Sequence, residues 1–170
     1  MKSYAGIGSR ETPDEILELI RKIALKLDRQ GYTLNSGGAS GADTAFENDS
    51  TRKQIFLPSD SFNGRFHNGV DYFNYQKLQH RDLAEETVGI FHPAAHKLTD
   101  YAFKLMARNT FQVLGKNLQQ SVEFVICWTP EGKEVGGTSQ AIRIAKSVNI
   151  PVLNLGKPKV LERFNRFVAE

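Results

Sequence analysis

Three short glycine-rich stretches contain the residues best suited to bind an anion. They read Gly6-Ile7-Gly8-Ser9-Arg10, Ser36-Gly37-Gly38-Ala39-Ser40-Gly41-Ala42-Asp43 and Gly136-Gly137-Thr138. Glycine allows the backbone to approach a ligand closely, because no Cβ atom intervenes. If the stretch also opens a helix, unpaired N–H groups and the positive end of the helix dipole face the ligand. A phosphate is the simplest anion that suits this arrangement.

Four side chains inside these stretches admit more than one role. Arg10 is either a solvated cation or a side chain that reaches over the glycines to a phosphate. Asp43 either stabilises the first turn of its own helix or contacts a ligand, and we favour the local role because a carboxylate is stabilising there in any case. Ser36 and Ser40 can equally cap a helix or hydrogen-bond a ligand.

Each glycine-rich stretch is predicted to follow a strand and to precede a helix. The strands begin near residue 4, at residue 32 and at residue 122, and the last is rich in branched and aromatic side chains. After the third stretch, apolar residues recur at helical spacing: Ala141, Ile142, Ala145 and Val148. In an open parallel sheet such strand ends lie at one edge, so we expect Gly8, Gly37 and Gly137 to border one cavity.

The remaining pattern predicts a Rossmann-like, doubly wound α/β fold of about five mostly parallel strands with helices on both faces. The first helix has Thr12 as its N-cap, Pro13 in its first position and Glu15 at the capping-box position. Two more strands are predicted over residues 54–58 and 150–155, and further helices over residues 75–88, 98–114 and 160–168. The length of 170 residues suits a single nucleotide-binding domain over residues 1–170.

Residues 59–75 form the least regular segment of the sequence. Five aromatic residues alternate there with Asn, Gly, Arg and His. A loop of this length inside a compact domain is usually functional or mobile, and aromatic rings beside Arg and Asn can stack on bases. We expect most of these rings to pack against the core, which leaves one or two at most for a ligand.

Arg108 and Asn109 lie in the second half of the helix predicted over residues 98–114. Both residue types are common on solvent-facing helix surfaces, and that is one interpretation of the pair. This helix, however, leads directly into the strand that begins at residue 122. The alternative is therefore that both side chains are held near the crevice.

The composition of the chain bears on which ligands it could bind and on where in the cell we expect it. The sequence has 22 basic and 19 acidic residues, so nucleic-acid binding would need clustered cations, and the sequence contains no dense cluster. Apolar runs are only strand length and no leader precedes the first strand, so we expect a cytoplasmic protein without a membrane partner. Cys127 is expected to be a buried, inert thiol. His80, His92 and His96 lack paired cysteines, and we expect neither a metal nor a cofactor.

The three glycine-rich motifs together with Arg108-Asn109 resemble the superfamily that joins the DNA-processing protein A (Smf) family to the "lonely guy" phosphoribohydrolases. The likeness extends over roughly residues 3–155. It implies a Rossmann-like domain of the SLOG type that binds nucleotides, nucleotide derivatives or single-stranded DNA. The residues expected to bind the ligand or its phosphate are Gly8, Ser9, Arg10, Ser36, Gly37, Gly38, Asp43, Arg108, Asn109, Gly136, Gly137 and Thr138.

The resemblance also bears on catalysis. In the phosphoribohydrolases the third loop reads Pro-Gly-Gly-x-Gly-Thr-x-Glu-Glu, and a glutamate in it takes part in cleaving an N-glycosidic bond. This chain has Gln140 and Ala141 at the corresponding positions, and a glutamine cannot serve as a general base. If the chain hydrolyses nucleotides, our first candidate for the carboxylate is Glu131, with Glu134 and Asp43 as further candidates. An exposed, solvated turn is an equal alternative for Glu131.

The residues and the resemblance together favour two functions, which we rank. The first is a protein that binds a nucleotide or nucleotide derivative and, if it is an enzyme, cleaves the N-glycosidic bond of a nucleoside 5′-monophosphate. The alternative is a single-stranded DNA-binding module, which the second glycine-rich stretch and Arg108-Asn109 favour and the low net charge disfavours. A homo-oligomer is compatible with the sequence.

Overall fold

The computed structural model describes residues 2–170 and has a sheet of six parallel strands at its centre. The strands are β1 (Ser3–Gly6), β2 (Thr33–Ser36), β3 (Lys53–Leu57), β4 (Tyr72–Asn74), β5 (Val125–Cys127) and β6 (Val152–Asn154). Their order in the sheet is β4-β3-β2-β1-β5-β6. The chain therefore moves outward from β1 to β4 and then returns to the other side of β1. The point at which the direction reverses lies between β1 and β5, and ligands of such sheets bind there.

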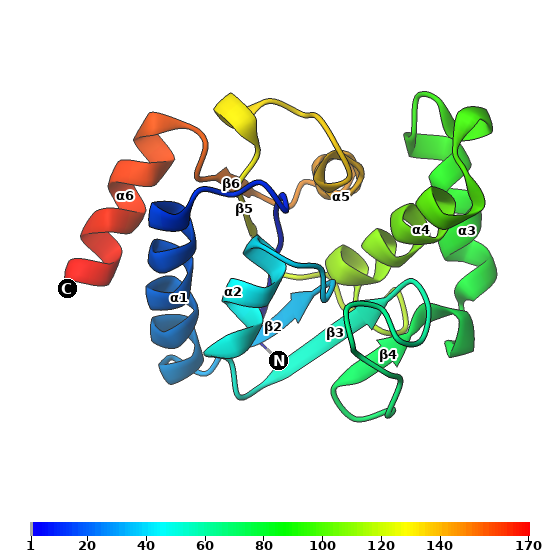
Figure 1. Cartoon of the computed structure of the whole chain (residues 1–170), viewed down its shortest axis with the longest axis horizontal. Helices are drawn as coiled ribbons and strands as arrows, with labels where there is room; N and C mark the ends of the chain where they lie inside the picture. The colour runs from blue at the N-terminus through cyan, green and yellow to red at the C-terminus, as the bar shows by residue number, and fades with distance from the viewer. Residues whose placement is uncertain (1) are drawn as a thin grey trace.

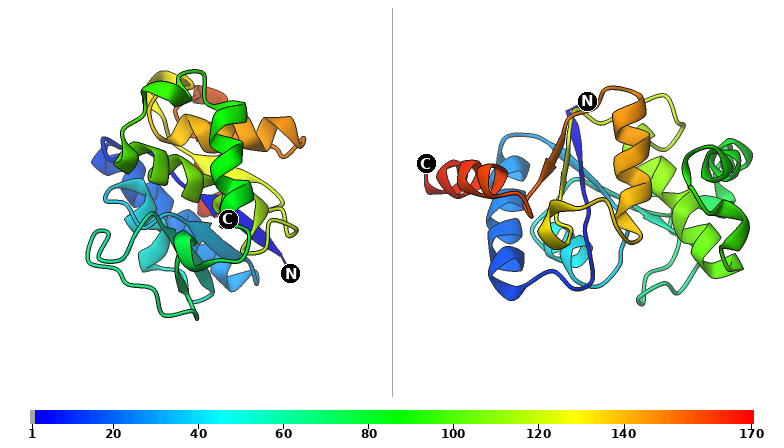
Figure 2. Two further views of the ribbon diagram at one scale, coloured as in Figure 1. Left: turned by 90° about the vertical axis from the view of Figure 1, so that its right-hand side faces the viewer. Right: turned by 90° about the horizontal axis from the view of Figure 1, so that it is seen from above.

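Six α-helices cover the two faces of the sheet (Figure 1). They are α1 (Asp14–Arg29), α2 (Ala42–Asn48), α3 (Arg81–Phe91), α4 (Asp100–Leu114), α5 (Thr138–Ser147) and α6 (Pro158–Ala169). Helices α1, α2 and α6 pack on one face, and α3, α4 and α5 pack on the other, as the two views of Figure 2 also show. The Rossmann-like α/β fold is thus confirmed, with one strand more than predicted.

Alternation along the strands explains why both faces are apolar. In β1, Tyr4 belongs to the core cluster built with α1 and α2, and Ala5 to the cluster built with α5. In β5, Ile126 lies in the first cluster, whereas Val125 and Cys127 lie in the second. Successive side chains of a strand point to opposite faces, so a parallel strand covered on both sides is apolar throughout. Burial raises the pKa of the Cys127 thiol to about 12.

The additional strand, β4, lies inside the segment predicted to be irregular. β4 has only three residues, Tyr72, Phe73 and Asn74, and it pairs with β3 in parallel register from Ile55 to Leu57. Such a short run, placed after glycines and asparagines, has no periodicity of its own. The helix predicted over residues 75–88 is likewise divided, into the 3₁₀ turn η1 (Tyr75–Lys77) and α3.

The predicted capping box of α1 is wrong. Pro13 occupies the N-cap position, and no side chain caps the helix. The Thr12 hydroxyl instead donates to the Ser9 carbonyl oxygen over 2.6 Å, and the Thr12 N–H donates to the same oxygen. Thr12 therefore closes a turn that fixes the backbone of Ser9 and Arg10, immediately after β1.

Gly89 allows a test of the helical assignment of α3. A Cβ atom added at this exposed position would meet no atom within 4 Å. Because glycine is more costly than alanine inside a helix, Gly89→Ala should raise the free energy of unfolding by about 0.5–1 kcal/mol in denaturant titrations. The control is Gly115→Ala, where φ is +86° and a Cβ would lie 2.7 Å from the Gln120 carbonyl oxygen. A stabilised control or a destabilised Gly89→Ala protein would contradict the assigned geometry.

Candidate functional site

A cavity of about 490 Å³ lies at the carboxyl ends of the strands, at the point where the strand order reverses. This volume is in the range of small-molecule sites. Its lining is built from the loop after β1, the loop after β2, one face of α4 and the loop before α5. The lining residues are Ile7, Gly8, Ser9, Arg10, Glu11, Ala39, Asp43, Tyr101, Leu105, Met106, Arg108, Asn109, Gln112, Pro130, Val135, Gly136, Gly137 and Thr138.

Most of the residues singled out from the sequence meet at this cavity. Those that line it are Gly8, Ser9, Arg10, Asp43, Arg108, Asn109, Gly136, Gly137 and Thr138. Those that do not are Ser36, Gly37, Gly38 and Glu131. The expectation that Gly8, Gly37 and Gly137 all border one cavity therefore needs a correction. The loop after β2 reaches the cavity through Ala39, and Asp43 of α2 also lines it, whereas Gly37 and Gly38 are buried outside the lining.

Gly37 is required by packing instead of by a ligand. A Cβ atom added there would collide with the guanidinium of Arg108 and the amide of Gln112. Ser36 is equally enclosed, and its hydroxyl donates to the Gly6 carbonyl oxygen across the strand ends. Gly38 has a φ of +72°, and a Cβ atom added there would lie 2.9 Å from the side chains of Arg65 and Leu57. These three residues lie outside the lining and are held there by hydrogen bonds to neighbouring residues.

Arg108 is buried, with 6% of its surface exposed, and its guanidinium is bound to the backbone. It donates to the carbonyl oxygens of Leu105 (3.1 Å), Phe56 (3.3 Å) and Gly37. Burial lowers its pKa, and the negative charge of Asp43 opposes that shift. An arginine stays protonated in proteins, so the cavity has a fixed positive charge at its floor. The solvent-facing interpretation of Arg108 is wrong.

Asn109 holds the opposite side of the cavity. Its side-chain Nδ2 donates to the carbonyl oxygen of Gly137 over 2.8 Å, and the residue is 5% exposed. Two consecutive residues of α4 thus fasten two different loops, because Arg108 binds Gly37 and Asn109 binds Gly137. The pair fixes the width of the crevice.

The start of α5 presents unpaired backbone donors to the cavity. No acceptor among residues 2–170 pairs with the N–H groups of Gly137 and Thr138, and no side chain caps the helix. A Cβ atom added at Gly137 would meet only the Met106 methyl group, at the ordinary distance of 3.6 Å, and φ is −66°. Neither packing nor backbone conformation therefore demands glycine here, in contrast to Gly37. What the missing side chain does provide is open access to the N–H groups.

Asp43 joins the first two loops. Its Oδ1 accepts from the Gly8 N–H (3.2 Å) and its Oδ2 from the Ala39 N–H (3.3 Å). The carboxylate is 3% exposed, and burial raises its pKa to about 6, against the opposing effects of Arg108 and the two N–H donors. Its structural role extends beyond its own helix, because it ties the loop after β1 to the loop after β2.

The rim of the cavity is formed by exposed side chains. Arg10 is exposed, and its guanidinium has no hydrogen-bond or ion-pair partner within residues 2–170. Tyr101, in the first turn of α4, contributes the one aromatic ring of the described lining and is 52% exposed. Val135 is also exposed on the loop before α5. A ligand in the cavity would thus meet a solvated cation and an aromatic face at the entrance.

Of the three candidate carboxylates, only Asp43 lines the cavity. Glu131 lies in the 3₁₀ turn η3 (Pro130–Gly132), is exposed and forms an ion pair with Lys133 (2.8 Å). Glu134 forms an ion pair with Lys146 on α5. Gln140 is fully buried outside the lining, and its Oε1 accepts from Arg143. The carboxylates that line the cavity are Glu11 and Asp43.

One wall of the cavity was not expected from the sequence. Four residues recur every three or four positions along α4 and face the same space: Tyr101, Leu105, Arg108 and Gln112. The signal was present, because residues at this spacing share a helix face and Arg108 was already a candidate. Its meaning depends on which face α4 turns toward the strand ends, which only the packing decides.

Groups of metal-binding side chains and helices that could cross a membrane are both absent from the part of the chain that the structure describes. Across residues 2–170, no three His, Cys, Asp or Glu residues are grouped so as to hold a metal ion. No helix in the same range has the length and apolar character needed to cross a membrane.

Comparison with known proteins gives a likeness of fold. No protein-family model matches the chain, and no curated protein matches it. Among solved structures, it is similar to DNA processing protein A from Helicobacter pylori, with a TM-score of 0.58 and 18% sequence identity. The match covers 99% of this chain and 79% of the other. That structure was described for the single-stranded DNA binding mode of the Helicobacter protein.

The buried carboxylate makes a prediction for the pH dependence of stability. The pKa of Asp43 is about 6 in the folded chain and 3.8 ordinarily. The native state therefore retains this proton between the two values, so Asp43 contributes stability that is full below pH 3.8 and is lost as pH rises through 6, by about 3 kcal/mol. Unfolding titrations of wild type and Asp43→Asn from about pH 4 to about pH 7 should show this difference. Parallel pH profiles would contradict it.

Proposed function

We propose that the chain binds single-stranded DNA and seats one nucleotide in the cavity, with its phosphate against the start of α5. The observation that carries the proposal is the open approach to the N–H groups of Gly137 and Thr138. They are unpaired within the described chain, they lie at a helix N-terminus, and the glycine is not required by packing. Backbone donors and the helix dipole together favour a phosphate.

Two arginines suit the same anion. Arg108 supplies a fixed charge at the floor of the cavity, and Arg10 is free at the rim to close on a bound phosphate. Arginine is the side chain best matched to phosphate, because its planar fork donates two parallel hydrogen bonds. Arg10 is the better candidate for a direct contact, since Arg108 already donates to three carbonyl oxygens.

The apolar part of the lining suits a base. Tyr101, Leu105 and Met106 form one wall on α4, and Val135 lies on the loop across the entrance. An aromatic face at the entrance can stack on a base of any sequence. A base that enters a cavity of about 490 Å³ must leave a duplex, so single strands are the preferred ligand.

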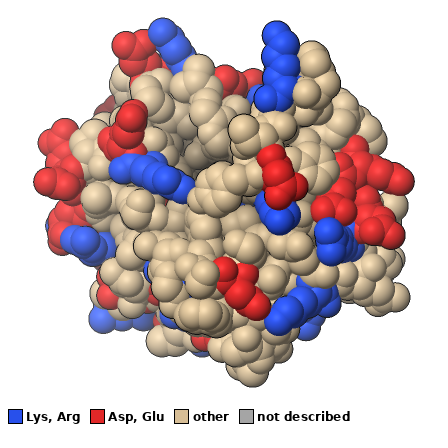
Figure 3. Space-filling view, turned by 45° about the vertical axis from the view of Figure 1, so that its right-hand side comes forward, with Lys and Arg blue, Asp and Glu red and all other residues tan. Residues whose placement is uncertain are grey.

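The distribution of surface charge favours a binding site for a few nucleotides over a long positively charged groove. On the face drawn in Figure 3, Lys and Arg side chains are interspersed with Asp and Glu side chains. Few phosphates would be neutralised, so affinity should fall only weakly with salt, with a slope of about −0.7 for each contacted phosphate.

The likeness to the Helicobacter pylori protein supports this function over the one ranked first from the sequence. That protein has the same fold over nearly the whole of this chain and binds single-stranded DNA. N-glycosidic hydrolysis has no comparable support from a similar protein. Gln140 is buried outside the lining and Glu131 is exposed and paired with Lys133, while Asp43, which does line the cavity, accepts hydrogen bonds from the Gly8 and Ala39 N–H groups. Free nucleoside monophosphates should then compete with the strand for the cavity.

The direct test is fluorescence anisotropy with oligothymidylates, in wild type and in the series Gly137→Ala and Gly137→Val. Each added group enters the open space at the N–H donors, so affinity should fall by at least about tenfold in the alanine variant and further in the valine variant. Stability should change little, because the Cβ meets no atom closer than 3.6 Å.

Gly89→Ala is the matched control, since it adds the same methyl group to an exposed helix far from the lining. Its affinity for DNA should equal that of wild type. If wild type binds no single strand, or if folded Gly137→Val binds as tightly as wild type, the proposed function is wrong.

A further inference from the structure

One of the five aromatic side chains in residues 59–75 is left uncovered. Phe62, Phe73 and Tyr75 are buried, and Tyr72 is partly buried. Phe66 is 61% exposed. Single exposed apolar side chains are ordinary on protein surfaces, so exposure alone assigns Phe66 no role. What distinguishes this ring is that the residues on both sides of it are anchored and that its segment adjoins the cavity.

The support of Phe66 is rigid on both sides. Before it, the Arg65 Nε donates to Glu47 over 2.8 Å, and the Arg65 Nη1 donates to the Asn63 carbonyl oxygen. After it, the His67 N–H donates to Asp60 over 2.9 Å, while the His67 Nδ1 accepts from the Asn74 N–H. The ring therefore stands between two anchored residues and is not carried on a free loop tip.

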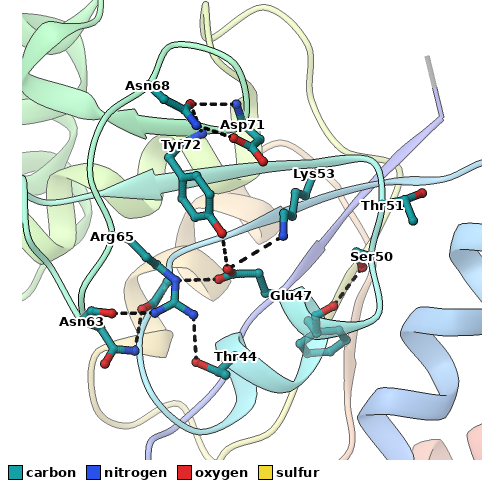
Figure 4. A network of polar contacts seen from close by, with 12 residues as sticks. Thr44, Glu47, Ser50, Thr51, Lys53, Asn63, Arg65, Asn68, Asp71 and Tyr72 are labelled. Atoms are coloured by element: carbon teal, nitrogen blue, oxygen red, sulfur yellow. Dashed lines mark hydrogen bonds and ion pairs between the residues drawn. The ribbon is translucent and has the colours of Figure 1, made fainter.

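Glu47 of α2 is the centre of the anchoring network (Figure 4). It is 5% exposed and also accepts from the Tyr72 hydroxyl over 2.6 Å, with the Lys53 ammonium at 4.0 Å. Burial and this hydrogen bond raise the pKa of Tyr72 to about 12. The segment is thus fastened to α2 and β3, and Arg65 and Lys53 share the single carboxylate of Glu47.

The segment adjoins the cavity. The Asn63 Nδ2 donates to the Gly38 carbonyl oxygen over 3.1 Å, and the ring of Phe62 lies 5.5 Å from the Arg108 guanidinium. Gly38 is followed by Ala39, which lines the cavity. A single strand that leaves the cavity on the side of β2 reaches this segment next.

We infer that Phe66 is a second platform, on which a base stacks beyond the nucleotide held in the cavity. The inference rests on the proposed function and extends it, because the ligand must be a strand longer than one nucleotide. Stacking is the chemistry available to Phe66 itself, since a phenyl ring has no charge and forms no ion pair with a phosphate. The contribution of Phe66 is therefore independent of salt.

The test compares thymidine 5′-monophosphate, measured by competition, with a dodecathymidylate in anisotropy titrations of wild type, Phe66→Ala and Phe66→Trp. Loss of one stacked base should weaken the long strand by about fivefold to about 150-fold in Phe66→Ala and leave the affinity for the mononucleotide unchanged. Phe66→Trp should bind the long strand at least as tightly as wild type. The salt slope should be equal in all three proteins, because no phosphate contact is removed.

Ile90→Ala is the control, because Ile90 is 72% exposed on α3 and lies outside both regions. It should alter neither affinity. If wild type binds both ligands and Phe66→Ala binds the long strand equally well, the second platform is wrong and the cavity site stands. If Phe66→Ala weakens the mononucleotide and the long strand in parallel, Phe66 acts through the cavity and the inference is likewise overturned. If wild type binds neither ligand, the proposed function and this extension fall together.

Discussion

The crevice depends on hydrogen bonds from two consecutive side chains of α4 to backbone carbonyl groups of the surrounding loops. Arg108 binds the carbonyl groups after β2 and in β3, and Asn109 binds that of Gly137 before α5. A buried guanidinium is costly to desolvate, and here three carbonyl acceptors and the nearby charge of Asp43 offset that cost. Removing Arg108 would take a donor from each of these carbonyl groups, so the residue is structural as much as electrostatic.

The division of roles among the glycines follows from this interaction. Gly37 has no side chain because the Arg108 guanidinium occupies that space, whereas Gly137 has none although the space is free. A sequence motif treats both residues alike. Their different surroundings separate a glycine that the packing requires from one that neither packing nor backbone conformation requires, and the second lies beside the unpaired donors of α5.

The sequence was sufficient for the fold, because apolar strands followed by glycine-rich turns and amphipathic helices specify a doubly wound sheet. It was insufficient where tertiary contacts outweighed local preference. Thr12 had the right position for an N-cap, but its hydroxyl donates to Ser9. β4 has too few residues to show an alternation of apolar and polar side chains. Arg108 is of a residue type that is usually exposed to solvent, although here it is buried. The spacing of residues along α4 shows which of them share one face of the helix. Whether that face turns toward the cavity depends on how the helix packs on the sheet.

The central claim is that the N–H groups at the start of α5 hold a phosphate, and amide NMR observes those groups directly. The measurement is a titration of the ¹⁵N-labelled chain with dithymidylate, followed through the backbone amide signals. We predict that the signals of Gly137 and Thr138 shift downfield and saturably, as expected for N–H groups that gain a charged acceptor. Saturable binding that leaves both signals unmoved, with shifts confined to other parts of the chain, would contradict the claim.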